Sequence, residues 1–361
     1  MKNKIKILHV IPVFATGGAE RLVLHYARLF DKSKYELHVA SCVEDGELRS
    51  EFEKLGVSIF VGSRKKMGSR QAVYSELEKY VENIRPDIIH THLLSSDFFG
   101  FNLKRKLKNK IVWVSTLHNV EKATSFVKQI LWCYVLSKTD KVVSVGKKVE
   151  IFAKREFKVP EGNVQTILNG IDLENWLKVK NTQIFTNKKI QIACVGRLWK
   201  QKGHEYLFKA LSQIGLEYQL HLFGDGPLKD KLEKLADNLN INNNIVWHGV
   251  VKDVYKYLDD IDVVVQPSLW EGLSLVVMET MAAGKIVITT PAGGDELIKD
   301  GKTGFIVKSK NSRALAEKIK EVCKNKETVK KVGEGARKFA NENFSIEKNV
   351  EKLDNLYKSL L

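Results

Sequence analysis

Short apolar runs alternate with amphipathic stretches along almost the whole chain, and this alternation constrains the fold more than any other feature. The runs have the length and the Val and Ile content of buried strands, and apolar side chains recur at helical spacing between them. Strands that alternate with helices form parallel sheets with helices on both faces. The predicted strands of a first sheet are residues 5–11, 36–42, 57–61, 87–90, 111–115, 141–145 and 164–168.

The pattern restarts after a polar stretch at residues 169–189, which indicates a second unit of the same kind. A length of 361 residues agrees with two domains, each large enough for its own core. We therefore predict two doubly wound α/β domains, residues 1–172 and 173–344, and a last helix over 345–361. The predicted strands of the second sheet are residues 190–195, 219–223, 245–247, 263–265, 286–289 and 305–307.

Composition is that of a soluble globular protein, with 43% hydrophobic and 28% charged residues. The apolar start of the chain is interrupted by His9 and Pro12, so it reads as a first core strand and not as a signal peptide. No run approaches the roughly 18 apolar residues that span a bilayer. Four widely spaced cysteines without a CxxC motif indicate reduced, packed thiols in the cytoplasm: Cys42, Cys133, Cys194 and Cys323.

Two glutamates spaced eight residues apart follow the predicted strand 263–265. Glu271 lies in a turn with Gly272, and Glu279 lies in the helix that follows. Backbone N–H groups at Ser274 and Leu275 would point from the positive end of that helix toward an anion such as a phosphate. The helical step allows at most roughly 12 Å between the carboxylates, which is the scale of a nucleotide sugar. A solvated helix face is the alternative explanation of this pair.

A cationic loop follows the predicted strand 190–195. Its presence argues against a solvated helix face as the explanation of the two glutamates. Arg197 and Lys202 lie in this loop, at the carboxyl end of a parallel strand, where open α/β sheets bind their ligands. Two fixed cations at this place can neutralise a departing diphosphate without a metal ion.

These motifs, taken in order, resemble the retaining nucleotide-sugar glycosyltransferases of family 4, the group 1 glycosyltransferases. The resemblance implies the GT-B fold, in which two Rossmann-like domains face a central cleft and the last helix packs on the first domain. The first domain would bind the acceptor, and the second would bind the nucleotide sugar. Further matching segments are Gly17-Gly18-Ala19-Glu20, Thr116-Leu117-His118-Asn119, Asn169-Gly170-Ile171-Asp172, Gly224-Asp225-Gly226-Pro227 and Gly301-Lys302-Thr303-Gly304.

The resemblance also implies roles for residues of the second domain. Arg197 and Lys202 would hold the donor diphosphate, assisted by the backbone at Ser274 and Leu275. Glu279 would accept hydrogen bonds from the ribose, and Glu271, next to Gly272, would accept them from the transferred sugar.

In the first domain the resemblance assigns substrate contacts to Gly17, Gly18 and His118. A tight turn is an equally good explanation of the two glycines. His90 and His92 also lie at a strand end, where they either line the cleft or pack in the core.

The implied reaction is transfer with retention at the anomeric carbon, driven by positioning and charge stabilisation. The leaving phosphate oxygen would help to deprotonate the acceptor. We expect no metal and no cofactor apart from a nucleotide-sugar co-substrate, for which a UDP-sugar is favoured. Asp260-Ile261-Asp262 matches the DxD pattern of metal-using enzymes, but it links a helix to a strand and we expect a structural role. A nucleotide-sugar epimerase of related fold is the alternative function.

The net charge of +16 lies mostly in the first half of the chain, which is the predicted acceptor-binding half. We expect a glycan or lipid-linked acceptor, synthesis of cell-surface polysaccharide, and peripheral contact with an anionic membrane. The basic residues are dispersed and no nucleic-acid-binding motif occurs, so we expect no nucleic-acid partner. The candidate membrane clusters are Arg64-Lys65-Lys66 with Arg70, and Lys104-Arg105-Lys106 with Lys108 and Lys110, beside Phe98, Phe99, Phe101, Leu103 and Leu107.

Overall fold

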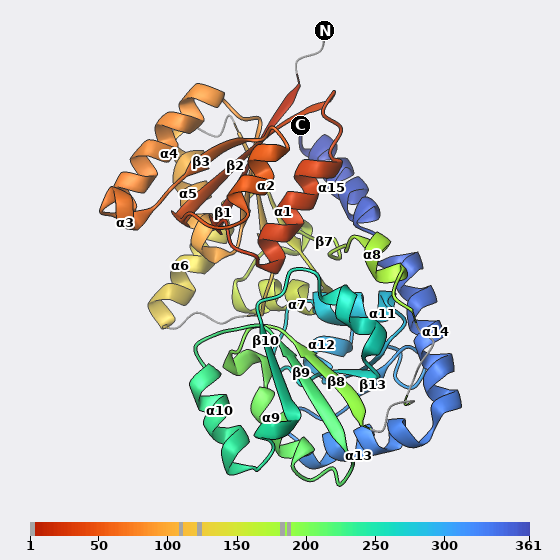
Figure 1. The fold of residues 1–361 in the computed structure, drawn as a ribbon. Coiled ribbons are helices and arrows are strands. Elements are labelled where there is room, and N and C mark those ends of the chain that lie inside the picture. The colour runs from red at the N-terminus through yellow and green to blue at the C-terminus, as the bar shows by residue number, and fades with distance from the viewer. Residues whose placement is uncertain (1–3, 108–110, 121–124, 181–184, 186–188) are drawn as a thin grey trace. The chain divides into compact units, whose positions relative to one another are not determined.

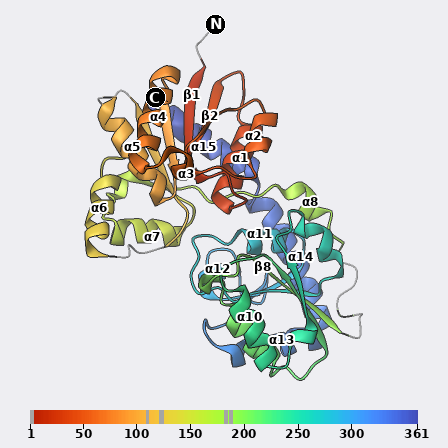
Figure 2. The same cartoon turned by 60° about the vertical axis from the view of Figure 1, so that its left-hand side comes forward.

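The computed structural model describes residues 4–107, 111–120, 125–180, 185 and 189–361. The chain divides into two compact units, which Figures 1 and 2 show from two sides. Unit 1 comprises Met1–Gly170 together with Ile346–Leu361, and unit 2 comprises Ile171–Ser345. Lys108 and Lys110 of the second basic cluster lie outside the described residues.

Unit 1 is built on a sheet of seven strands in the order β3-β2-β1-β4-β5-β6-β7, and every neighbouring pair is parallel. The first predicted parallel sheet is therefore confirmed. β1 runs two residues beyond the prediction, past a register shift in its pairing with β2. The strands are β1 (Ile5–Val13), β2 (Tyr35–Glu44), β3 (Ser58–Val61), β4 (Ile88–His92), β5 (Val112–Leu117), β6 (Lys141–Ser144) and β7 (Val164–Thr166).

Side chains of β1 alternate between two buried clusters, because successive residues of a strand point to opposite faces. Ile7 and Ile11 belong to one cluster, whereas Leu8 and Val10 belong to the other. The helices of unit 1 are α1 (Gly18–Leu29), α2 (Arg49–Lys54), α3 (Arg64–Met67), α4 (Arg70–Ile84), α5 (Leu94–Lys106), α6 (Phe126–Leu136), α7 (Lys147–Glu156), the short η1 (Glu161–Asn163) and α15 (Ile346–Leu360).

The last helix, α15, packs into the core of unit 1 through an apolar stripe. Leu353 and Tyr357 are almost fully buried there. The Asn349 side chain donates to the Leu168 carbonyl over 2.6 Å, and the Tyr35 hydroxyl donates to Asp354 over 2.5 Å. Residues from the two ends of the chain thus complete one domain.

Unit 2 has a sheet of six parallel strands in the order β10-β9-β8-β11-β12-β13, which confirms the second predicted sheet. The strands are β8 (Ile190–Val195), β9 (Tyr218–Phe223), β10 (Ile245–Gly249), β11 (Val263–Gln266), β12 (Ile286–Thr289) and β13 (Phe305–Ile306). The helices are α8 (Leu173–Leu177), η2 (Lys200–Lys202), α9 (His204–Leu211), α10 (Lys229–Asn238), η3 (Asn242–Asn244), η4 (Val254–Asp260), α11 (Leu275–Ala282), α12 (Pro291–Gly294), α13 (Ser312–Lys324) and α14 (Lys326–Asn343).

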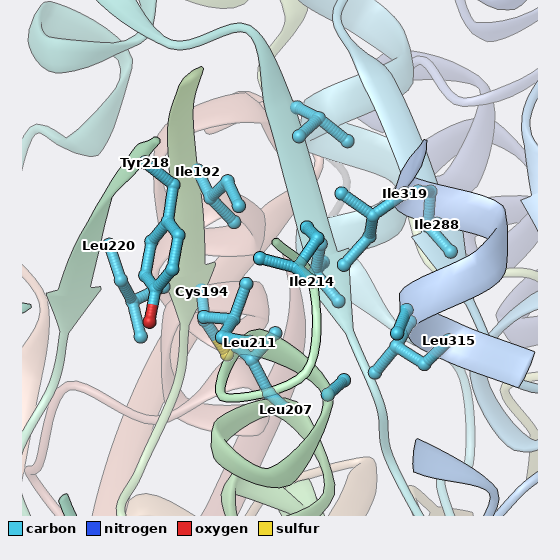
Figure 3. Close-up of a cluster of buried hydrophobic side chains, with 14 of the residues drawn as sticks. Ile192, Cys194, Leu207, Leu211, Ile214, Tyr218, Leu220, Ile288, Leu315 and Ile319 are labelled. Carbon is cyan, nitrogen blue, oxygen red and sulfur yellow. The ribbon is translucent and has the colours of Figure 1, made fainter. Parts of the chain in front are cut away.

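One face of the second sheet carries a large apolar core, which Figure 3 shows. Ile192 and Cys194 of β8 point to this face, and Leu207 and Leu211 of α9 pack against them. All four cysteines of the chain are unpaired thiols. Within the described residues, no helix is both long and apolar enough to cross a membrane.

Candidate active site

The loops after β8 and β11 meet at the carboxyl edge of the second sheet, because these strands are neighbours at the point where the strand order reverses. The Leu269 N–H donates to the Gln201 carbonyl over 2.7 Å. Gly203 has φ +66°, and a Cβ there would lie 2.2 Å from the Pro267 carbonyl oxygen. A glycine at 203 thus allows the two loops to approach closely.

A largely buried ion pair joins these loops. The Lys202 Nζ lies 2.6 Å from the Glu271 Oε1, and the two side chains are only 17% and 8% exposed. The Ser268 hydroxyl donates to the same carboxylate oxygen over 2.9 Å, and the Gln201 amide reaches the other oxygen over 3.3 Å. Two predicted site residues from separate loops are therefore in direct contact, with polar neighbours that compensate burial of the charges.

Gly196 makes room for the lysine of this pair. A Cβ at Gly196 would lie 3.1 Å from the Cε of Lys202, and the φ of +143° disfavours any other residue at 196. The missing side chain at 196 therefore leaves space for Lys202 in the position where it contacts Glu271.

The N-terminus of α11 offers unsatisfied polar groups beside the ion pair. Ser274 is its N-cap residue, yet its side chain accepts no capping hydrogen bond, and its buried Oγ has no partner in the structure. The first N–H groups of a helix, from Leu275 on, have no intrahelical acceptor. Gly272, in the preceding turn, is buried. An anion at this helix end would satisfy these groups.

The remaining predicted residues of unit 2 flank this arrangement. Arg197 is exposed in the loop that carries Lys202, and its guanidinium carbon lies 5.1 Å from the centroid of the Trp199 ring. Glu279 is partly buried, one turn into α11. The described contacts thus join Lys202 with Glu271 directly, whereas Arg197 and Glu279 lie on adjoining segments.

His118 of unit 1 is the partly exposed end of a chain of hydrogen-bonded imidazoles. The His118 Nε2 lies 3.1 Å from the His92 Nδ1, and the His92 Nε2 lies 3.0 Å from the His9 Nδ1. His9 is in β1, His92 ends β4 and His118 follows β5, and these three strands are neighbours in the sheet. Sequence analysis missed His9, because only the strand order brings it beside His92.

Burial keeps these imidazoles uncharged and couples their tautomers. It lowers the pKa of His9 and of His118 to about 3, and it lowers that of His92 well below the usual value. A neutral imidazole carries one N–H, so both hydrogen bonds must run in the same direction. The His9 Nε2 is buried without a partner, and a lone pair costs less there than an N–H. This favours His9 as the donor, which leaves the proton of His118 on Nδ1.

His90 and His92 are both fully buried, so each packs within the unit. His90 hydrogen-bonds to the Tyr357 hydroxyl at 2.5 Å and to the Thr116 hydroxyl at 2.6 Å. One nitrogen from each of His9, His90 and His92 lies within 4.8 Å of the others, and in the described part of the chain this is the cluster that could hold a metal ion. Both nitrogens of His90 and of His92 have protein partners, so a metal ion bound here would have to replace some of these hydrogen bonds.

Gly17 and Gly18 begin α1, with Gly17 as its N-cap residue. A Cβ on Gly17 would lie 2.2 Å from the Oε2 of Glu20, a buried side chain of the first helical turn. The missing side chain at 17 therefore makes room for a carboxylate of the same helix.

Asp262, the last residue of the Asp260-Ile261-Asp262 segment, has a structural role. The Phe185 N–H donates to the Asp262 Oδ1 over 2.6 Å, and the Gln191 N–H donates to the Oδ2 over 2.8 Å. Both oxygens of this buried carboxylate thus fix the backbone next to β8.

Two Rossmann-like domains in one chain, with a cationic loop at the switch point of the second, match the architecture of the GT-B fold. The family model "Glycosyltransferase Family 4" matches residues 16–175, and "Glycosyl transferases group 1" matches residues 178–339. The chain belongs to the group 1 glycosyltransferases of glycosyltransferase family 4 and is a glycosyltransferase.

Named relatives and solved structures agree with this assignment. An Escherichia coli UDP-Gal:alpha-D-GlcNAc-diphosphoundecaprenol alpha-1,3-galactosyltransferase is 25% identical, over 98% of this chain and 97% of its own length. A Campylobacter jejuni N-acetylgalactosamine-N,N'-diacetylbacillosaminyl-diphospho-undecaprenol 4-alpha-N-acetylgalactosaminyltransferase is 26% identical, over 86% and 88%. Anabaena HepE, solved in complex with UDP-glucose, superposes with a TM-score of 0.87 at 19% identity over 99% of this chain and all of its own. This last likeness concerns the fold.

Proposed function

We propose that the enzyme moves a sugar from a nucleotide-sugar donor, with UDP as the favoured nucleotide, to a hydroxyl of a lipid-linked glycan. The proposed reaction retains the anomeric configuration, needs no metal and serves the synthesis of cell-surface polysaccharide. The names of the Escherichia coli and Campylobacter jejuni relatives specify acceptors on diphosphoundecaprenol, which supports the lipid-linked acceptor. The complex of Anabaena HepE with UDP-glucose supports the choice of nucleotide.

The observation that carries the proposal is the buried Lys202–Glu271 pair beside the N-terminus of α11. A buried ion pair adds little stability compared with apolar packing, so its position at a sheet switch point favours a role in binding. Lys202 and the exposed Arg197 would stabilise the negative charge of the departing diphosphate. Glu271 would accept hydrogen bonds from hydroxyls of the transferred sugar.

In this proposal α11 contacts two different parts of the donor, the diphosphate and the ribose. The backbone at Ser274 and Leu275 would receive a phosphate oxygen, because the unpartnered Ser274 hydroxyl and the helix dipole both favour one. Glu279, one turn further along, would receive the ribose hydroxyls. Gly272 would keep the preceding turn narrow beside the sugar.

In unit 1, His118 would act as a neutral hydrogen-bond donor through its Nδ1 and not as a cation, because its pKa is lowered to about 3 by burial. Gly17 and Gly18 would contact the substrate through the backbone. With no protein base assigned, the leaving phosphate oxygen would accept the acceptor proton, and catalysis would rest on positioning.

Product stereochemistry and metal dependence test this proposal. When the donor is a UDP-sugar with an α-linkage, proton NMR of the product should again show an α-linkage; a β-linked product would refute retention. EDTA should leave the rate of transfer unchanged. Loss of activity in EDTA with rescue by manganese would refute metal independence. The epimerase alternative has no support from the relatives, and it predicts conversion of donor without any acceptor. The proposal keeps the enzyme in the cytoplasm, in line with its unpaired cysteines.

A further inference from the structure

Helix α6 exposes a continuous apolar face. Of its eleven residues, Val135 and Leu136 are buried. Five large apolar or aromatic side chains follow one another at spacings of one and three residues, which places them on one side of the helix. Their exposed fractions are 78% for Phe126, 74% for Val127, 54% for Ile130, 39% for Leu131 and 54% for Tyr134.

The opposite side of α6 is anchored in unit 1, so the orientation of the helix is fixed. The Trp132 ring lies 4.5 Å from the Phe98 ring of α5, measured between centroids. The Gln129 amide and the Cys133 thiol both donate to the Glu156 carbonyl at the end of α7. Figures 1 and 2 both show α6 at an edge of its unit, and Figure 2 shows it next to α7.

The concentration of apolar side chains distinguishes α6 from other exposed apolar residues. In unit 2, Val250 is 66% exposed and Tyr257 is 42% exposed, but each belongs to a different segment. Single exposed apolar residues are normal, whereas a contiguous set marks an interaction surface.

Positive charge borders this apolar face. Lys128 lies within α6 and Lys138 lies two residues beyond its end, and both are exposed. The Lys138 Nζ lies 5.2 Å from the Tyr134 ring centroid, and the Arg105 guanidinium lies 5.5 Å from that of Phe101, which itself packs against Tyr134. The partner of α6 must therefore be apolar in its centre and anionic at its rim.

We infer that α6 docks on the surface of an anionic lipid bilayer. Eleven residues rise roughly 16 Å, too short to cross a bilayer, so the helix would lie in the interfacial plane with its apolar face toward the acyl chains. The lysines would meet lipid phosphates. A second copy of the chain fits less well, because a symmetric dimer through α6 would bring two basic rims together.

This surface differs from the one that the sequence predicted. Phe99, Phe101 and Leu103 of the predicted aromatic stretch are buried, so they cannot enter a membrane. The aromatic and aliphatic side chains available for insertion come from α6 instead. The inference rests on this face alone and not on the proposed function, although it would hold unit 1 at the leaflet that carries a lipid-linked acceptor.

Cosedimentation with large unilamellar vesicles tests the inference directly. The full chain should bind vesicles of phosphatidylglycerol and phosphatidylethanolamine, and it should bind more weakly at about 0.5 M than at about 0.1 M salt and to pure phosphatidylcholine. The Phe126→Ser/Ile130→Ser variant should lose at least about ten-fold in its partition coefficient. Lys128→Glu/Lys138→Glu should lose a similar factor on the anionic vesicles only.

Matched controls lie on unit 2, on exposed positions of the same kinds. Val250→Ser and Lys231→Glu/Lys330→Glu should bind vesicles as the unchanged protein does. Circular dichroism would verify the fold of every variant. Absence of vesicle binding, or equal loss in the unit 2 controls, would overturn the inference. So would a dimer in analytical ultracentrifugation that Phe126→Ser/Ile130→Ser dissociates, because α6 would then be a protein interface.

Discussion

The two units share a strand order at their switch points but present opposite chemistry there. In unit 2 the loops after β8 and β11 meet around a largely buried ion pair of a lysine and a glutamate. In unit 1 the strands β1, β4 and β5 bring together a chain of uncharged histidines. The shared topology therefore determines where a site forms, and the residues at the strand ends determine whether it is charged.

This difference suits the two halves of the proposed reaction. A diphosphate carries charge that cations and helix N-termini can stabilise, and unit 2 provides both. An acceptor hydroxyl and a sugar are neutral, and neutral imidazoles can orient them without attracting competing anions. The following predictions test whether the charged and the neutral site behave differently.

Breaking the charged site should have the largest effect. Lys202→Met would leave the buried Glu271 carboxylate without its counter-charge, and we expect a loss of about 3 kcal/mol in the free energy of unfolding together with loss of transfer. Chemical denaturation measures the loss of stability, and a donor-turnover assay measures the loss of transfer. Lys256→Met breaks an exposed pair of the same 2.6 Å length and should lower the free energy of unfolding far less, because solvent screens an exposed pair. If Lys202→Met and Lys256→Met lose the same free energy of unfolding, burial of the Lys202–Glu271 pair does not make its charges more important for stability.

Removing both charges of the Lys202–Glu271 pair should restore stability without restoring activity. Lys202→Met/Glu271→Gln removes both buried charges, so it should regain most of the lost stability and stay inactive. A double variant as unstable as Lys202→Met would show that the charge imbalance is not the cause.

Arg197→Ala should reduce turnover roughly a hundred-fold while leaving the fold intact, because this exposed guanidinium would act mainly on the charge of the leaving diphosphate. Steady-state donor kinetics measure the effect. Arg313→Ala, which removes another exposed arginine of unit 2, is the control and should have normal rates. Unchanged turnover in Arg197→Ala would remove this residue from the site.

The neutral site should make unit 1 sensitive to acid. The folded state excludes a proton from His9 down to about pH 3, whereas the unfolded chain binds one below about pH 6.5. Stability should therefore fall as pH drops through this window, by about 1.4 kcal/mol per pH unit for His9. Asp97 affects the pH dependence of stability in the opposite direction, since burial raises its pKa to about 7. This contribution is present in the unchanged chain and in the His9→Phe variant, so it cancels when the two are compared.

Urea unfolding at about pH 7.5 and about pH 5.5, on either side of the ordinary histidine pKa, measures the His9 contribution. The difference between the two pH values should be smaller in His9→Phe than in the unchanged chain. Identical pH dependence would mean that His9 is not held neutral in the folded state.

The smallest effect should come from interrupting the histidine chain. His92→Phe keeps an aromatic ring but removes the partner that fixes the His118 tautomer, so turnover should fall about ten-fold. Nitrogen-15 NMR of the His118 ring should show loss of the Nδ1–H form. His221→Phe removes a similar histidine hydrogen bond in unit 2 and should leave both readouts unchanged. An unaltered His118 spectrum in His92→Phe would disprove the tautomer coupling.

Sequence alone identified the periodic features of this molecule. Each of the thirteen strands that the structure describes overlaps a predicted one, since apolar runs between helices are a local signal. The pairing of Lys202 with Glu271 was not foreseen, because it depends on how two distant loops approach. His9 was overlooked for the same reason. The exposed face of α6 was also missed, because an apolar helix looks the same in sequence whether its face is buried or exposed.

Calorimetric titration with UDP is the most direct test of a charged donor site in unit 2. The unchanged protein should bind UDP, and the Lys202→Met/Glu271→Gln variant, in which folding has been verified, should bind at least about a hundred-fold more weakly. Equal affinity of the two proteins for UDP would contradict the account, because the nucleotide would then bind away from the loops that carry Lys202 and Glu271.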